Sequence, residues 1–306
     1  MKNILLAIII LNNGTVCYSQ QATQDTNFIV RINTVEWLPD GKQILLSVIK
    51  FNKTERKMSP LSKVYIYDFT TKKLTPSLSN AANIAVSPNG KSVAFFKRDD
   101  TRRQDIYLYD LATGTETVLK TDTFRKFSLS WSPDGKKLTY NITYNGEGQN
   151  STIDICIVDI YTKQVKQISH SGKHKSYNPV WGPDGKHIVY YLEKGDHRDQ
   201  IYLTDTDGSF HRNITNDTTT LNYYPSWIDS NTILYTVDPN QTATISIDGS
   251  KKQILPDLTT DRATYNRSSG RFAFIDNTKG NKVVIFDPKK KTKVIIVDEI
   301  MLIGLL

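Results

Sequence analysis

Short runs of residues that are apolar, or that alternate between apolar and polar, follow one another along the chain. One kind of turn recurs between two successive runs. In Trp131-Ser132-Pro133-Asp134-Gly135-Lys136, the proline presets φ for a type I turn and the glycine takes the left-handed position that follows. The run after such a turn is apolar, as in Ile188-Val189-Tyr190-Tyr191. This pattern predicts an antiparallel hairpin, with the tryptophan on its first strand, where a large ring can fill the space between neighbouring sheets.

The turn pattern recurs over nearly the whole chain. The later copies match the turn motif less well: one contains Asp229-Ser230-Asn231, and the last contains Ser268-Ser269-Gly270. Steps of 39 to 50 residues separate the equivalent positions, which are Trp37, Val86, Trp131, Trp181, Trp227 and Asn266. Self-similarity at this period indicates a propeller or a related repeat array.

Each repeat also contains a later strand that ends in aspartate and leads into a second turn. Ile106-Tyr107-Leu108-Tyr109-Asp110 is one example; it is followed by Ala112-Thr113-Gly114 and the strand-like Glu116-Thr117-Val118-Leu119. Each unit therefore has four strands, and four-stranded units at this period are propeller blades. We predict an all-β fold, a six-bladed β-propeller of four-stranded antiparallel blades.

These two motifs resemble the repeats of the TolB family, whose blades carry a Trp-Ser-Pro-Asp-Gly-Lys hairpin followed by an Ile-Tyr-x-x-Asp strand. The resemblance covers roughly residues 30 to 298. TolB proteins carry an α/β domain before the propeller, whereas here the strand-like Phe28–Ile32 follows the leader, so we expect the propeller without that domain. Similar propellers precede hydrolase domains in prolyl-peptidase relatives, but this sequence has no Gly-x-Ser-x-Gly elbow.

Residues 1–19 are predicted to be a signal peptide. Lys2 gives a basic start, Ile4–Leu11 is apolar, and small residues at Cys17 and Ser19 suit a cleavage site. This pattern predicts a periplasmic or secreted protein. The apolar run is far shorter than the ~20 residues that span a bilayer, so we expect no transmembrane span. Lipidation of Cys17 is the alternative, although Val16 is large for the position before a lipidated cysteine.

Residues 20–306 are predicted to form a single propeller. Two ways of closing its ring remain open: Phe28–Ile32 pairs within the last sheet (residues 27–32 then close the ring), or Lys293–Val297 supplies the outer strand of that sheet. The apolar Met301–Leu306 is expected to dock against the last blade. The blades are expected at roughly 33–79, 80–122, 123–170, 171–217, 218–258 and 259–298.

Composition narrows the function classes. The 306 residues are 38% hydrophobic, which is ample for a packed core, and the formal charge is +8. The basic clusters are scattered over different repeats, so we do not expect nucleic-acid binding.

Cys156, the only thiol left once the leader is removed, lies in an apolar strand and is expected to be buried. We expect a monomer.

Candidate binding residues lie where the chain enters the first strand of each blade. The short hairpins occupy one face of a propeller, so sequence variation and binding are expected on the other face, around the central funnel. Tyrosine, asparagine and arginine suit a ligand- or peptide-binding surface, although Tyr177 and Tyr223 could instead pack between blades. The candidates are Arg125, Lys126, His174, Tyr177, Asn178, Tyr223, Tyr224 and Arg262.

His170, His174 and His197 are weak candidates for a metal site, because imidazoles together with carboxylates suit zinc or manganese. Their spacing in loops fixes no geometry, and we expect neither a metal nor a cofactor. The sequence favours a non-enzymatic binding or scaffold module of the cell envelope, with a protein, peptide or glycan as its ligand. The alternative is a carbohydrate-active enzyme that resembles oligogalacturonate lyases, with a funnel site near His174 and Arg262.

Overall fold

The computed structural model describes residues 28–52, 54, 57–98, 104–120, 124–144, 151–195, 199–260, 262–278, 280–298 and 301–302. The predicted signal peptide, Cys17 and His197 lie outside the described residues. Within the described ranges, no helix has the length and apolarity needed to cross a membrane.

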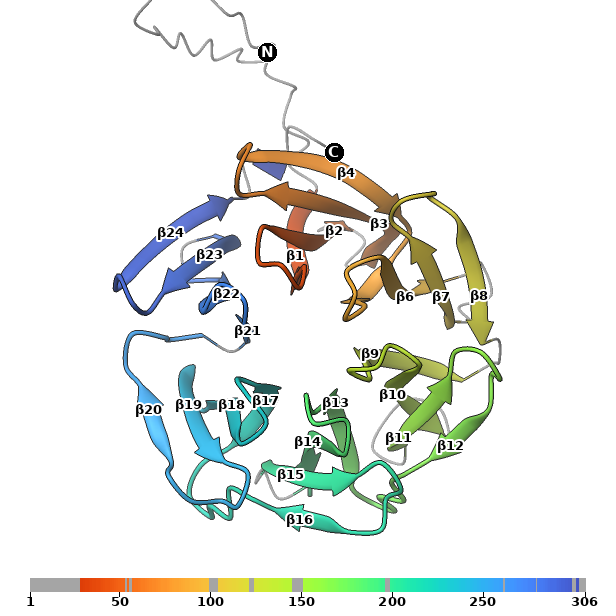
Figure 1. Cartoon of the computed structure of the whole chain (residues 1–306), viewed down its shortest axis with the longest axis vertical. Helices are drawn as coiled ribbons and strands as arrows, with labels where there is room; N and C mark the ends of the chain where they lie inside the picture. The colour runs from red at the N-terminus through yellow and green to blue at the C-terminus, as the bar shows by residue number, and fades with distance from the viewer. Residues whose placement is uncertain are drawn as a thin grey trace, which may run out of the picture.

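The described residues form twenty-four β-strands, arranged as sheets around a central axis (Figure 1). The first twelve strands are β1 (Phe28–Trp37), β2 (Gln43–Asn52), β3 (Lys57–Asp68), β4 (Lys73–Ser79), β5 (Ala82–Val86), β6 (Ser92–Arg98), β7 (Gln104–Asp110), β8 (Glu116–Lys120), β9 (Arg125–Trp131), β10 (Lys137–Tyr144), β11 (Thr152–Asp159) and β12 (Val165–Gln167). The other twelve are β13 (Lys175–Trp181), β14 (His187–Glu193), β15 (Gln200–Asp205), β16 (His211–Asn213), β17 (Asn222–Trp227), β18 (Thr232–Val237), β19 (Gln241–Ser246), β20 (Gln253–Leu255), β21 (Ala263–Asn266), β22 (Arg271–Asp276), β23 (Lys282–Asp287) and β24 (Thr292–Val297).

Consecutive strands pair with one another in every sheet. Four sheets contain four strands each: β1–β4, β5–β8, β17–β20 and β21–β24. The fifth sheet has eight strands and consists of two four-stranded antiparallel units, β9–β12 and β13–β16, which meet at one parallel bridge between Ile153 and Lys175. The prediction of an all-β propeller built from four-stranded antiparallel sheets is therefore confirmed.

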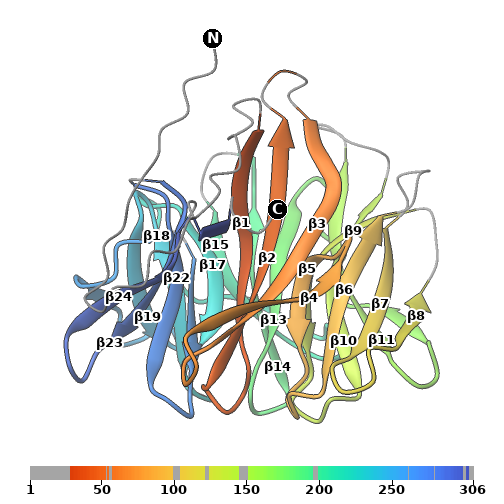
Figure 2. The same cartoon turned by 90° about the horizontal axis from the view of Figure 1, so that it is seen from above.

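The recurring turn closes the first hairpin of a sheet through short local hydrogen bonds. In the β1–β2 turn, Gly41 N donates to the carbonyl of Leu38 at 3.0 Å, and Lys42 N donates to Asp40 Oδ1 at 2.9 Å. The same pair of bonds recurs in the β9–β10 turn. The β1–β2 turn lies at one edge of the ring, whereas β2 ends and β3 begins at the opposite edge (Figure 2). The turn of the first hairpin, β1–β2, and the start of β3 thus lie on opposite faces of the propeller.

Two of the tryptophans before the turns, Trp131 and Trp227, bind a neighbouring sheet through their ring N–H. Trp131 Nε1 donates to the carbonyl of Ala85 at 3.0 Å, and Trp227 Nε1 donates to the carbonyl of Val180 at 3.1 Å. The rings of Trp37, Trp131, Trp181 and Trp227 are all buried. The predicted place of these rings between sheets is what the structure shows.

In the described part of the chain, the first and last sheets share no strand. Phe28–Ile32 belongs to β1 and pairs with β2, so the idea that it pairs within the last sheet is wrong. β24 is instead the outer strand of that sheet. Side chains close the seam: one apolar cluster includes Ile32 and Trp37 of the first sheet, Ile285 of the last, and Leu302, which is fully buried.

Candidate functional site

Five aromatic side chains form a continuous row on the face of the ring where the chain enters β9, β13 and β17. We call this row the tyrosine crescent. It comprises Phe127 on β9, Tyr177 on β13, Tyr191 on β14, and Tyr223 and Tyr224 on β17. The Tyr177 and Tyr191 rings are stacked with centroids 5.1 Å apart, and Tyr223 meets Tyr224 edge-on at 5.0 Å. Phe127 and Tyr224 extend the row from either end of the stacked pair, at 6.0 Å from Tyr177 and 5.8 Å from Tyr191. All five side chains are half-buried.

Bulges in the inner strands position the crescent. Ser128, Asn178 and Tyr224 all have positive φ, at 55°, 49° and 50°, and the pairing shifts register at each of these points. Asparagine tolerates this conformation, but for a bulky tyrosine it is rare and strained, and such strain concentrates at functional sites. A buried side chain stabilises the bulge at Asn178, because Asn178 N donates to Oδ1 of the fully buried Asn141 at 2.9 Å.

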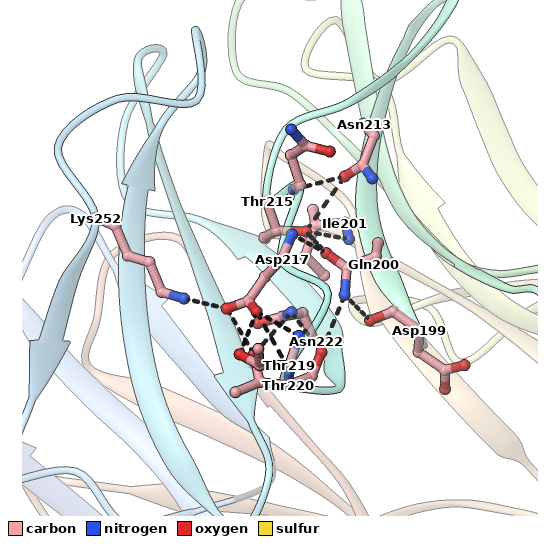
Figure 3. A network of polar contacts seen from close by, with 11 residues as sticks. Asp199, Gln200, Ile201, Asn213, Thr215, Asp217, Thr219, Thr220, Asn222 and Lys252 are labelled. Carbon is pink, nitrogen blue, oxygen red and sulfur yellow. Dashed lines mark hydrogen bonds and ion pairs between the residues drawn. The ribbon is translucent and has the colours of Figure 1, made fainter. Parts of the chain in front are cut away.

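A polar network fixes the start of β17 (Figure 3). Asn222 is fully buried, and its backbone N donates to the carbonyl of Asp199 at 2.7 Å. Gln200 Nε2 donates to the carbonyls of both Asp199 and Thr220, at 2.9 and 3.0 Å. Tyr223 and Tyr224 follow Asn222 directly, so the network fixes the start of the strand that carries these two crescent residues.

Asp217 completes this network from the connection between β16 and β17. Its Oδ1 accepts hydrogen bonds from Thr219 N and Thr219 Oγ1, and its Oδ2 accepts one from Lys252 Nζ at 2.9 Å. These bonds, led by the one from Lys252, hold the pKa of the Asp217 carboxyl well below its usual range. The connection is thereby fastened to the neighbouring sheet β17–β20.

Two of the crescent tyrosines, Tyr177 and Tyr191, remain neutral phenols. Burial, followed by the nearby Glu193 carboxylate, raises the pKa of Tyr177 well above its usual value; burial, followed by Tyr224, does the same for Tyr191. The carboxylates of Glu193 and Asp238 border the rings. Glu193 Oε1 lies 4.0 Å from Lys175 Nζ, and Asp238 Oδ1 accepts a hydrogen bond from the Tyr223 hydroxyl at 3.3 Å. The site therefore offers aromatic faces, phenolic donors and charges of both signs.

Arg262 lies at the Tyr224 end of the crescent. Its guanidinium carbon is 4.0 Å from the Tyr224 ring centroid, a close cation–π contact. The Arg262 side chain is exposed, and its backbone N donates to Thr260 Oγ1 at 3.3 Å. This contact joins the connection before β21 to the crescent.

The predicted binding residues divide into two groups. The structure brings Tyr177, Tyr223, Tyr224 and Arg262 together, and Asn178 accepts a hydrogen bond from Ser128 Oγ at 3.0 Å beside them. Arg125 is exposed at the start of β9. The placement of Lys126 on the funnel surface is wrong: its side chain is fully buried, and Nζ donates to the carbonyls of Gln104 and Phe124, both at 3.1 Å. Lys126 faces inward because alternate residues of a strand face opposite sides.

His170 and His174 lie in the connection between β12 and β13. His174 is half-buried, with its Nδ1 atom buried and without a hydrogen-bond partner, and His170 Nδ1 lies 3.2 Å from Gln167 Nε2. Among the described residues, no three His, Cys, Asp or Glu side chains come together as a metal site would require. Cys156 is buried, as its apolar strand predicts.

The candidates chosen from the sequence omit Tyr191, which holds the centre of the crescent. It lies on a second strand, and only the β13–β14 register, which pairs it with Tyr177, brings it into the row. The available signal was the unbroken run Ile188-Val189-Tyr190-Tyr191, in which one of two adjacent tyrosines must face each side of the strand.

Curated relatives match parts of the chain. An uncharacterized protein of Agrobacterium fabrum is 28% identical over 181 residues, which make up 58% of this chain and 56% of that protein. Dipeptidyl-peptidase 5 of Porphyromonas gingivalis is 28% identical over 47% of this chain and 21% of its own length. The uncharacterized peptidase YuxL of Bacillus subtilis is 27% identical over 60% of this chain and 31% of its own. The chain thus spans about half of the first relative and under a third of the two peptidases.

Solved structures share the fold at low identity. TolB from Acinetobacter baumannii aligns with a TM-score of 0.62 at 17% identity, covering 87% of this chain and 79% of that one. An oligogalacturonate lyase in complex with manganese aligns with a TM-score of 0.63 at 14% identity, covering 89% and 78%. The family model described as the TolB beta propeller domain matches residues 17–264. Repeats, sheets and family match agree: the chain belongs to the TolB β-propeller domain family.

Proposed function

We propose that this chain is a non-enzymatic binding module of the cell envelope that holds a segment of a partner protein on the tyrosine crescent. The observation that carries the proposal is the row of half-buried aromatic rings from Phe127 to Tyr224. Tyrosines supply large contact area at a small cost in side-chain entropy and are enriched at the energetic centres of protein interfaces.

The surroundings of the row suit a peptide. Extended chain segments need donors and acceptors for their backbone groups together with apolar surface for their side chains. The crescent offers both, since neutral phenols, the Asn178 amide and the Glu193 carboxylate lie beside the rings. A rigid ring of sheets holds these groups in place, and preorganised sites lose less entropy on binding.

We further infer that the propeller has six blades, the eight-stranded sheet counting as two, and that the chain is exported. The single bridge between Ile153 and Lys175 supports the first inference. Family membership and the leader-like residues 1–19 support the second. A periplasmic location would place the crescent among envelope proteins.

Capture of a partner tests the proposal. The full chain carrying an affinity tag is compared with Tyr191→Leu, which removes the central ring, on envelope extract of the source organism. Tyr161→Ala is the matched control, because Tyr161 is a 72% exposed tyrosine in the β11–β12 turn, on the hairpin face. We expect wild type and Tyr161→Ala to retain the same protein and Tyr191→Leu to lose at least about tenfold of it, given the energy of a central aromatic contact.

Two results would contradict the proposal. Equal retention of that protein by Tyr191→Leu would place the binding surface elsewhere. Turnover of oligogalacturonate by the purified chain would show an enzyme, the alternative that the sequence leaves open.

A further inference from the structure

The Arg262 guanidinium lies over the Tyr224 ring, and its N–H edge has no hydrogen-bond partner in the described part of the chain. It stacks on Tyr224 at 4.0 Å, and within the described residues the guanidinium group donates no hydrogen bond. Three other arginines differ: Arg212, Arg267 and Arg271 each donate to a backbone carbonyl. Arg262 is therefore an exposed cation over the Tyr224 ring, and its fork of N–H donors binds no acceptor among the residues that the structure describes.

A stacked guanidinium is well suited to recognise a carboxylate. The planar group presents paired N–H donors that match the two oxygens of a carboxylate, and stacking one face on a ring leaves that edge available. Stacking also fixes the side chain before a ligand arrives, so less rotamer entropy is lost on binding. Tyr224 itself is fixed by its bulge, with φ at 50°.

We propose that Arg262 binds a carboxylate of the peptide segment that lies on the tyrosine crescent, so that the site selects peptides bearing a carboxylate at one end of the bound stretch. This inference rests on the proposed function and specifies its ligand. The carboxylate comes from the C-terminus of the partner or from an acidic side chain, since both present the same two oxygens.

The charges around the crescent favour a peptide over an acidic glycan. Glu193 and Asp238 border the rings, and the carbonyl of Asp199 binds the start of β17 beside them. In Figure 3 the Asp199 side chain points away from the Gln200–Asp217 network. Carboxylates on this border would repel a polyuronate, which carries one charge on every sugar, whereas a peptide can place its single carboxylate at Arg262.

Defined peptides test the inference on the full chain. The probes are acetyl-Ala-Ala-Tyr-Ala-Ala with a free C-terminal carboxylate, the same peptide as its C-terminal amide, and an amidated version with glutamate in the fourth position. Binding is measured by calorimetry or by ligand-observed NMR at low salt. We expect at least one carboxylate-bearing probe to bind about tenfold or more tightly than the plain amide, the range of a charge-assisted hydrogen-bond pair.

Arg262→Lys should abolish that preference, because a lysine keeps the charge but lacks the planar fork. The matched control is Arg212→Lys, which alters an exposed arginine on β16 whose bond goes to Ile247. It should leave the preference unchanged. Which carboxylate probe binds more tightly distinguishes a chain terminus from an acidic side chain, and either result supports the inference.

The outcomes that overturn this inference differ from those that overturn the proposed function. Equal binding of the amide and carboxylate probes, with loss of both in Tyr191→Leu, would leave a peptide-binding crescent without carboxylate selection. A preference that survives Arg262→Lys would assign it to another residue. Binding of trigalacturonate in preference to all the peptides would make the ligand a glycan and overturn both, as would failure of every peptide to bind together with unchanged partner capture by Tyr191→Leu.

Discussion

Arg271 Nη2 donates to the carbonyl of Gly41 at 2.6 Å, although 230 residues separate the two in sequence. The same guanidinium lies 4.6 Å from the Phe69 ring centroid and 5.3 Å from that of Trp37. One side chain of the last sheet thus binds the first hairpin turn and two aromatic rings of the first sheet. The seam depends on such contacts because no backbone ladder crosses it in the described part of the chain.

Arg271→Ala should lower the free energy of unfolding by about 3 kcal/mol, the sum of a charge-assisted hydrogen bond and a half-buried cation–π contact. Urea denaturation followed by tryptophan fluorescence measures it. Arg212→Ala is the control, since Arg212 donates to one carbonyl from an exposed position; a loss of about 1 kcal/mol is expected there. Equal losses in the two variants would contradict the role assigned to the seam.

Gly41→Ala should destabilise the same seam by crowding. Gly41 has φ +70°, and a Cβ atom there would lie 2.6 Å from Asn266 Oδ1 and 2.9 Å from Ser269 Cβ. Gly195→Ala separates crowding from conformation, because Gly195 has φ +78° and a Cβ there would meet nothing within 4 Å. Gly195→Ala should cost about 1–2 kcal/mol for its conformation alone, and Gly41→Ala clearly more. The idea fails if thermal unfolding shows the same cost for both.

Asp217→Asn should flatten the acid limb of the stability curve. The pKa of Asp217 is lower in the folded chain than its ordinary value of 3.8, so its contribution is complete above about pH 4 and is lost as the pH falls toward the folded pKa. At pH 7 the variant should lose about 2 kcal/mol through its weakened bonds to Lys252 and the threonines. As the pH falls from about 4 toward the folded pKa, the two curves should converge. A constant difference across this range, measured by urea denaturation at each pH, would rule out the linkage.

Tyr224→Asn should separate binding from stability. Asn178 occupies the equivalent bulge with φ 49°, and asparagine tolerates this conformation better than tyrosine. Relief of strain should offset part of the lost packing, so we expect thermal unfolding to change by no more than about 1–2 kcal/mol. Loss of the ring removes the surface on which Arg262 stacks, so binding of the carboxylate peptide should fall at least about tenfold. Unchanged binding would show that Tyr224 does not position Arg262.

Local chemistry made the sheets predictable. Proline, aspartate and glycine each have a defined place in the hairpin turn, and the tryptophan before it needs a large apolar gap, so the sequence alone predicts strands, turns and the packing between sheets. The partner of Phe28–Ile32 was not predictable in the same way. An apolar alternating run indicates a strand but does not say with which sheet it pairs.

The binding site was predictable only in part, because inner-strand bulges break the alternation of faces. Arg125 and Lys126 are adjacent and chemically alike, so alternation turns one outward and the other inward. The bulge at Ser128, between them and the buried Trp131, decides which: Arg125 is exposed and Lys126 is fully buried. A bulge adds a residue to one strand and reverses the facing of those beyond it, and no turn residue marks its position in the sequence. The place of Tyr191 likewise depended on a register between two strands.

The sheets of this propeller consist of consecutive strands, which makes each blade a single gene segment as well as a structural unit. Duplicating or deleting one such segment in the gene would change the circumference of the ring without unpairing a strand in any remaining sheet. Only the side chains at the new junctions between blades would need to fit a new neighbour. Ring size is therefore open to change by duplication in this architecture, more readily than in one whose chain ends interlace.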